Sequence, residues 1–208
     1  MNGTFTLTRG ISEVYAAEVT ADTIESYTAG TPFHLIPTGE MTRTVNSDSA
    51  TQHFDNAPFW TIKEEGETDI SITGAALRPA MIARLLGKDV DSTTGAILDS
   101  GEAETVYFAL CAKCDYVDGT SEYIWFLKGY FDAPESSNKT IDDTTDANGT
   151  SLTFHAMKTI HQFTVGDESK GMKKVTIDTA DTALKSTQTW NAQVVTPDNL
   201  GTICEAVA

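Results

Sequence analysis

Two cysteines, Cys111 and Cys114, have the C-x-x-C spacing that metal centres and redox sites use. A structural zinc site needs four ligands, usually from a second such pair, and the only other cysteine is Cys204. The surrounding residues TVYFALCAKC (105–114) predict a strand, in which residues three apart face opposite sides. Redox pairs of the thioredoxin type stand at a helix start instead. We therefore expect small core or interface cysteines, with no metal and no cofactor.

Other residues capable of chemistry are scattered. The four histidines, which form neither HExxH nor a paired-ligand spacing, are His34, His53, His155 and His161. The acidic segment DDTTDANGT invites comparison with a calcium loop, but aligning it on Gly149 puts Thr144 first and His155 twelfth, and neither fits. A solvated loop is the better interpretation.

Catalytic motifs are missing from the sequence: it contains no GxSxG, P-loop or Rossmann glycine pattern. The carboxylate pairs Glu64-Glu65 and Asp142-Asp143 fall in polar turns, where nothing would raise a pKa. Formal glycosylation sequons begin at Asn2, Asn138 and Asn148, but the first residues do not resemble a signal peptide. We expect a protein that is not an enzyme.

Composition limits the partners. The 208 residues suit one domain, and their formal net charge is −16. Such a surface repels phosphate, which argues against a protein that reads DNA or RNA sequence, and it disfavours anionic membranes. The most apolar segment, AALRPAMIARLLG, is too short to span a membrane and carries two arginines. Composition alone favours the cytoplasm.

The elements that must carry these residues are mostly strands. The segment YIWFLKGYFDAP (123–134) is dense in aromatic and branched residues and ends at Pro134, so a strand is predicted. Both of its faces are largely apolar: Trp125, Leu127, Gly129 and Phe131 lie on one, and Lys128 lies on the other. What covers the second face is an open question.

Asp118-Gly119 predicts a two-residue turn that joins this strand to 105–114. The resulting hairpin would place Cys114 opposite Tyr123, Ala112 opposite Trp125, and Leu110 opposite Leu127. One short helix is predicted at about 76–87, with Pro79 in its first turn and Gly87 after its last. Its apolar face comprises Met81, Ile82, Leu85 and Leu86.

Short strands are also predicted at 4–9, 14–19, 33–36, around Ile70 and Ile72, and at 151–157, 159–165, 174–178 and 189–196. Residues 88–104 are expected to be a polar loop. Residues 41–60 lack periodicity and predict a loop or arm, with Phe59 and Trp60 packed back onto the core. The fold class is mainly β: a β-sandwich or partly open barrel with one flanking helix, long loops and arms. Residues 1–208 form one domain, least certain over 167–208.

The central block resembles a known family. It comprises EGETDISITGAALRPAMIARLLG (65–87) and TTGAILDSGEAETVYFALCAKCDYVDGTSEYIWFLKGYFDAPES (93–136), the latter ending in W-x-x-K-G-x-F and a proline. This order resembles the major tail proteins of long-tailed bacteriophages, in particular the phi13-type group, and GISEVYAAEVT (10–20) is similar to that family's first strand. The resemblance covers residues 10–165 and is loose beyond them. Cys111, Cys114 and the Asp-rich loop 142–148 depart from the family.

The resemblance implies a structural tail tube subunit of the virion, made in the host cytoplasm. Such subunits form hexameric rings whose sheets join into one inner β-barrel, and the rings stack into a conduit for DNA. The partners would be other copies, tape-measure, terminator and baseplate or tip proteins, and passing DNA that is not specifically bound. The core or assembly residues would be Trp125, Leu127, Lys128, Gly129, Phe131, Met81, Ile82, Leu85, Leu86, Phe59 and Trp60.

The same resemblance suggests that the short helix or a neighbouring subunit covers the second face of strand 123–134, and that 41–60 is an arm between rings. An acidic lumen would let DNA slide, although the charge count does not say which face is acidic. Three alternatives stay open: the inner tube of a contractile tail, a secreted or surface β-sandwich that binds carbohydrate or acts as an adhesin, and a hydrolase with an unrecognised site.

Overall fold

The computed structural model describes residues 5–54, 57–101, 104–134, 149–181 and 190–203, without the side chains of 48–54, 58, 59 and 61–65. The chain is mainly β, as expected. The strands of its large sheet are β1 (Thr8–Asp22), β2 (Tyr27–Ala29), β3 (Phe33–His34), β4 (Thr38–Phe54), β5 (Ala57–Gly74), β8 (Phe108–Tyr116), β9 (Ser121–Phe131), β10 (Thr150–Met157) and β13 (Lys174–Asp178). Two small hairpins pair β6 (Asp89–Val90) with β7 (Ile97–Leu98) and β11 (Gln162–Val165) with β12 (Glu168–Gly171).

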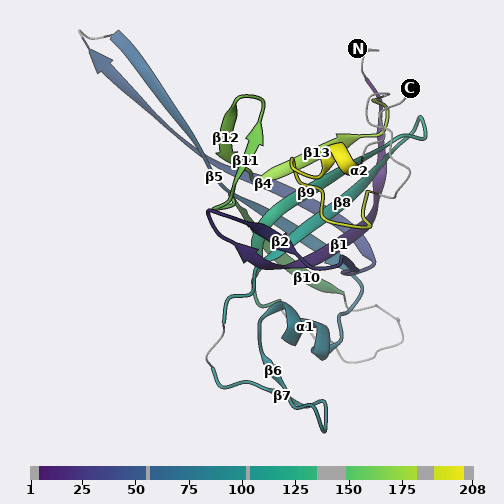
Figure 1. The fold of residues 1–208 in the computed structure, drawn as a ribbon. Helices are drawn as coiled ribbons and strands as arrows, with labels where there is room; N and C mark the ends of the chain where they lie inside the picture. Colours follow the sequence, from purple (N-terminus) through teal and green to yellow (C-terminus); the bar gives the residue numbers. More distant parts are fainter. Residues whose placement is uncertain (1–4, 55–56, 102–103, 135–148, 182–189, 204–208) are drawn as a thin grey trace, which may run out of the picture.

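The sheet is antiparallel and runs in the order β2-β1-β8-β9-β10-β5-β4. It divides at β9, whose first half pairs with β13 through Glu122–Phe126, while its last residues pair with β10 through Lys128–Phe131. The sheet curls around its core without closing into a barrel (Figure 1). The predicted strand 14–19 lies within β1. Of the predicted strand 4–9, only Thr8 and Arg9 belong to β1, residues 5–7 are not in a strand, and residue 4 lies outside the described residues.

The β8–β9 hairpin forms as predicted, but its register is shifted by one residue. Cys111 lies opposite Trp125 and Ala112 opposite Ile124. The connection is a three-residue loop because the Gly119 N–H donates to the Tyr116 carbonyl and Gly119 has φ +87°. A left-handed glycine after a tight turn is typical of three-residue hairpin loops. The predicted pairs, based on a two-residue turn, are therefore wrong.

The helix α1 (Pro79–Leu85) begins at the predicted proline. It ends at Leu86 and the left-handed Gly87, where the Lys88 N–H donates to the Ala83 carbonyl over 2.9 Å. That bond is the long closure of a Schellman cap. A second helix, α2 (Leu200–Ile203), was not predicted, because a four-residue segment has no visible helical period.

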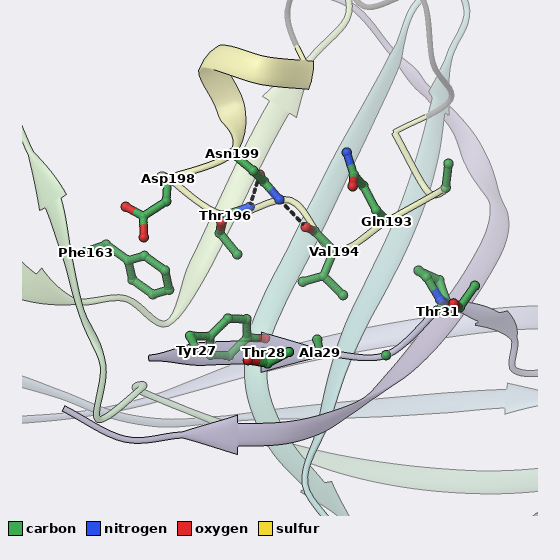
Figure 2. Close-up of a pocket in the computed structure, with 13 residues that line it drawn as sticks. Tyr27, Thr28, Ala29, Thr31, Phe163, Gln193, Val194, Thr196, Asp198 and Asn199 are labelled. Atoms are coloured by element: carbon green, nitrogen blue, oxygen red, sulfur yellow. Dashed lines mark hydrogen bonds between the residues drawn. The ribbon is translucent and has the colours of Figure 1, made fainter. Parts of the chain in front are cut away.

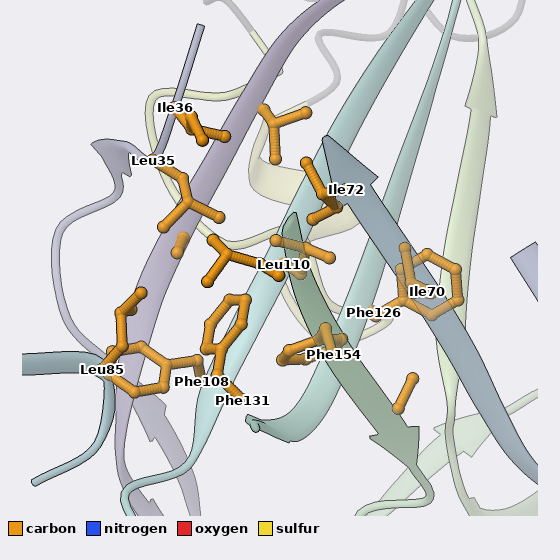
Figure 3. Close-up of a cluster of buried hydrophobic side chains, with 14 of the residues drawn as sticks. Leu35, Ile36, Ile70, Ile72, Leu85, Phe108, Leu110, Phe126, Phe131 and Phe154 are labelled. Carbon is orange, nitrogen blue, oxygen red and sulfur yellow. The ribbon is translucent and has the colours of Figure 1, made fainter. Parts of the chain in front are cut away.

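Both faces of β9 are buried, each in a different core. The first core contains Ile124 and Phe126 of β9, Phe108 and Leu110 of β8, and Leu85 of α1, under β5 and β10 (Figure 3). The second contains Tyr123, Trp125 and Leu127 of β9 and is covered by Trp190, Val194, Val195 and Ile203 of the C-terminal segment. The sequence left two covers open for the second face of β9, which carries Lys128: the short helix or a neighbouring subunit. Leu85 of α1 packs in one core with Ile124 and Phe126 of that face, as the first of these alternatives predicts.

Residues 189–196 were predicted to form a strand, but the described part, from 190 on, has no strand pairing. Its apolar residues pack onto β9 and β13 as an irregular cover. The Trp125 indole N–H fixes this cover by donating to the Trp190 carbonyl over 2.8 Å within the protein interior. A pattern of apolar residues predicts burial. Here the residues are buried, but they form no hydrogen-bonded strand pair.

The loop or arm predicted at 41–60 is a β-hairpin. It belongs to β4 and β5, which pair from Thr38 opposite Gly74 out to Phe54 opposite Ala57. The far part of this hairpin projects well beyond the body of the sheet (Figure 1). Trp60 lies on the projecting part and is 63% exposed, so the prediction that it packs onto the core is wrong.

Candidate assembly surfaces

The projecting part of the β4–β5 hairpin is the first candidate surface. β10 pairs with β5 only over Thr68–Gly74. Beyond that point, from Ser47 opposite Glu65 to the tip, the two strands pair only with each other among the described residues. Unpaired strand edges are templates for pairing with another chain, and a lone two-stranded hairpin is only marginally stable in water. The hairpin therefore has two edges available to a partner.

A polar network anchors the root of this hairpin. The Asn46 side chain of β4 donates to the Asp69 carboxylate of β5 over 2.9 Å. His155 of β10 contacts Asp69 through Nδ1 and Asp132 through Nε2, each over 2.7 Å, and its ring stacks on Tyr130 with centroids 5.0 Å apart. Both ring nitrogens have a carboxylate partner, and only the imidazolium can donate from both.

The charge of His155 follows from opposing effects. Partial burial lowers its pKa, but the hydrogen bonds and Coulombic attraction of Asp132 and Asp69 outweigh burial, so its pKa lies above the usual value. The Asn46 hydrogen bond, aided by His155, lowers the pKa of Asp69. Sequence reasoning missed this network because its members are far apart in the chain. Only the β5–β10 register, which puts His155 opposite Asp69, brings them together.

Lys128 is in the protein interior. Its ammonium lies 2.6 Å from an Asp22 carboxylate oxygen and 4.6 Å from the centre of the Tyr107 ring. Asp22 also accepts the backbone N–H groups of Ile160 and His161. Although burial opposes ionisation, these hydrogen bonds together with Lys128 give Asp22 a lowered pKa. The lysine of the W-x-x-K-G-x-F pattern thus ties β9 to β1, and Asp22 of β1 also holds the residues just before β11.

Gly129, the next residue in that pattern, is required by close packing. A Cβ at this position would overlap the His155 carbonyl oxygen and the Phe154 ring of β10. Leu127 lies in the second core, and its carbonyl accepts the Tyr27 hydroxyl over 2.6 Å. Phe131 lies in the first core against Phe154. These residues hold the fold together, and an additional role in assembly stays a prediction.

The four predicted helix residues have unequal surroundings. Leu85 is buried in the first core and Met81 packs against it, while Ile82 and Leu86 are only partly buried. Leu86 lines a pocket of about 420 Å³ between α1, the residues that follow β7 and the end of β9. The helix therefore flanks the sheet, as expected, and leaves a cavity beside it.

Cys111 and Cys114 lie on opposite faces of β8. Cys111 is in the second core, where burial raises the pKa of its thiol, and Cys114 is half-buried opposite Glu122. Several residues singled out above lie outside the described part of the structure: Asn2, Asn138, Asp142, Asp143, Thr144, Asn148 and Cys204, and the side chains of His53, Phe59, Glu64 and Glu65.

A second cavity, of about 560 Å³, lies between β2, β11 and residues 192–199 (Figure 2). Asn199 shapes one wall because its amide accepts the Thr196 N–H and donates to the Val194 carbonyl. The lining includes the Asp198 carboxylate, Thr31 and Gln193, and no lysine or arginine. These groups can form hydrogen bonds with a neutral hydroxylated molecule and do not attract an anion.

The described residues contain no group of three or more histidine, cysteine, aspartate or glutamate side chains that could hold a metal ion. They also contain no helix of the length and apolarity that crossing a membrane requires.

No protein-family model matches this chain, and no curated protein matches it. Among solved structures, it is similar to a chain in the extended PVC sheath–tube complex of an extracellular contractile injection system, with 7% identity and a TM-score of 0.40 over 79% of this chain and 88% of that one. It is also similar to a chain in the tube-terminating cap of the anti-feeding prophage, with 6% identity and a TM-score of 0.41 over 85% and 94%.

Proposed function

We propose that this protein is a structural subunit that assembles with copies of itself into a tube of the phage-tail type. The observation that carries the proposal is the projecting β4–β5 hairpin, whose two edges have no partner strand among the described residues. It extends from a curled sheet that does not close on itself. A second copy can satisfy the free N–H and C=O groups of such edges by strand pairing.

In this proposal the copies form a closed ring in which each hairpin extends a neighbour's sheet, and rings stack into a tube. The family resemblance supplies three further details of the proposal: six copies per ring, a non-contractile phage tail, and DNA as the cargo. The net charge of −16 supports DNA as the cargo, because an acidic conduit does not bind the phosphate backbone.

The test removes the hairpin's projecting part. A variant lacking residues 48–64, with Ser47 joined to Glu65 through Asn-Gly, keeps the anchoring network at Asn46 and Asp69. We expect this variant to fold, so that its far-ultraviolet circular dichroism shows the β signal of the sheet that it retains. We also expect it to stay monomeric in sedimentation velocity. The matched control is Ile24→Ser, which changes an exposed apolar residue away from the hairpin and should assemble like the wild type.

Assembly of the shortened variant into the same rings as the wild type would refute the role of the hairpin. A hairpin variant that fails to fold is recognised by its circular dichroism. In that case Trp60→Asp, which alters one exposed side chain on the projecting part, replaces it and is expected to weaken assembly.

A second candidate function is carbohydrate binding, and the polar 560 Å³ cavity favours it. The cavity volume falls in the range of small-ligand sites, and Gln193, Asp198 and Thr31 offer hydroxyl-compatible partners. A glycan array with the wild type and Gln193→Ala tests this candidate. Binding that the substitution abolishes would support it, and a blank array would dismiss it.

A further inference from the structure

The two ends of the β8–β9 hairpin carry surfaces with complementary chemistry. At the turn end, the N-terminal segment (residues 5–9) runs past the loop of the hairpin: Thr8 pairs with Tyr116, and the Val117 N–H donates to the Leu7 carbonyl over 3.0 Å. Its Phe5 is 104% exposed and its Leu7 is 74% exposed. Exposed apolar residues grouped at one place are typical of interaction surfaces. The first ten residues of the chain contain Arg9 and no acidic residue.

The opposite end of the hairpin carries the 420 Å³ pocket beside α1. Its apolar lining comes from Leu85, Leu86, Val106 and Phe131, and its acidic lining comes from Asp99, Glu104 and Asp132. Lys88 pairs with Asp99, and His155 pairs with Asp132. Glu104 is exposed and makes no ion pair with another described residue. The pocket thus offers an apolar floor and one carboxylate for a partner.

The segment and the pocket cannot meet within one molecule. The segment adjoins Tyr116 and Val117, while the pocket adjoins Tyr130 and Phe131 at the far end of β9. The eleven residues of β9 separate them, which corresponds to about 35 Å at ~3.3 Å per residue. Figure 1 shows the beginning of β1 at the end of the sheet opposite α1.

We propose that the N-terminal segment of one copy docks into the α1 pocket of a second copy, with Phe5 on the apolar floor and Arg9 against Glu104. A patch at one end that fits a pocket at the other makes a head-to-tail contact, and such contacts repeat without closing unless the rotation closes them. The contact therefore runs along the stacking axis of the tube. This inference rests on the proposed self-assembly and names the surfaces that would join successive rings.

The test uses a fluorescent peptide of residues 1–10 and the full-length chain at a concentration where it is monomeric, with binding measured by anisotropy. We expect saturable binding. The peptide with Phe5→Ser should bind about tenfold more weakly, since a buried phenylalanine side chain contributes that much or more. Changes in the peptide cannot disturb the fold of the chain, so a loss of binding reports the contact itself.

Charge exchange identifies the pocket. Glu104→Arg in the chain should weaken binding of the wild-type peptide, and an Arg9→Glu peptide should restore it. The matched control is Asp198→Arg, which makes the same charge change at an exposed residue of the other cavity. No saturable binding, or equal effects of Glu104→Arg and Asp198→Arg, would overturn the proposal.

The outcome is separable from that of the proposed function. Electron microscopy of the Glu104→Arg chain should show rings that no longer stack. If the peptide does not bind while the wild type still forms tubes, only this contact is wrong. If the peptide binds as described while the wild type forms chains without rings, the contact stands and the ring proposal fails.

Discussion

The buried pair Lys128–Asp22 allows a quantitative test of how the fold is held together. The two charged groups are 2.6 Å apart, with side-chain exposures of 8% and 4%. Two backbone N–H groups, from Ile160 and His161, complete the coordination of the carboxylate. Removing one partner of such a pair leaves the other charge buried and uncompensated, which typically costs about 3–5 kcal/mol.

Asp22→Asn is the sharpest perturbation, because it keeps the shape and one acceptor oxygen while it removes the charge. We expect the free energy of unfolding to fall by about 3–5 kcal/mol, a large share of the ~5–15 kcal/mol of a typical domain. Adding Lys128→Met should recover part of this loss, because the double variant buries no lone charge. Urea unfolding at pH 7, followed by tryptophan fluorescence and circular dichroism, measures each value.

The reasoning would be refuted by two results. One is an Asp22→Asn variant within about 1 kcal/mol of the wild type, the value typical of an exposed pair. The other is a double variant as unstable as the single one. Acid titration gives an independent check, since the pKa of Asp22 is lowered in the folded state. The stabilisation it contributes is present above the unfolded value of about 3.9 and is lost as pH falls through the folded pKa.

Three further predictions concern single residues. Gly129→Ala should lower the free energy of unfolding by roughly 1–3 kcal/mol or more, because its Cβ would overlap Phe154 and the His155 carbonyl. Gly201→Ala is the control, because its backbone needs no left-handed φ and no atom lies within 4 Å of its Cβ, and an equal loss in both variants would contradict the packing argument. Trp125→Phe should cost about 1–3 kcal/mol, because it leaves the Trp190 carbonyl without its indole donor, and thermal unfolding would show it. His155 has a raised pKa, so its stabilisation is complete below about pH 6.5 and is lost as pH rises through the folded pKa. The protection factors of β5 amides at the hairpin root, which correct for the intrinsic rise of amide exchange with pH, should fall across that range in the wild type and not in His155→Gln. Wild-type protection factors that do not change with pH would disprove the anchoring role.

The sequence predicted the parts of the fold that local signals specify. Pro79 and Gly87 mark the ends of α1, and the alternation around Ile70 and Ile72 marks the buried inner part of β5, where both residues are fully buried. The hairpin at Asp118-Gly119 follows from its turn chemistry, yet its register depends on loop length. A two-residue and a three-residue loop use the same Asp-Gly pair, so the sequence did not distinguish them.

The missed features depend on partners distant in the chain. Residues 41–60 are mostly polar and lack the alternation of a strand with one buried face, so their sequence predicts a loop or arm. The apolar residues Trp190, Val194 and Val195 suggested a strand, although they cover a core without ladder bonds. The contacts of His155 with Asp69 and Asp132, and of Lys128 with Asp22, arise only once the sheet is assembled.

The central claim is that copies of this chain assemble through free strand edges. Negative-stain electron microscopy of the purified chain over a range of concentration and salt tests it most directly, because added salt screens the repulsion between subunits that each carry −16. We predict rings or hollow tubes of uniform width that become more abundant as salt and concentration rise. The variant lacking residues 48–64 should form neither rings nor tubes. A chain that stays monomeric under every condition, or that forms only irregular aggregates, would contradict the account.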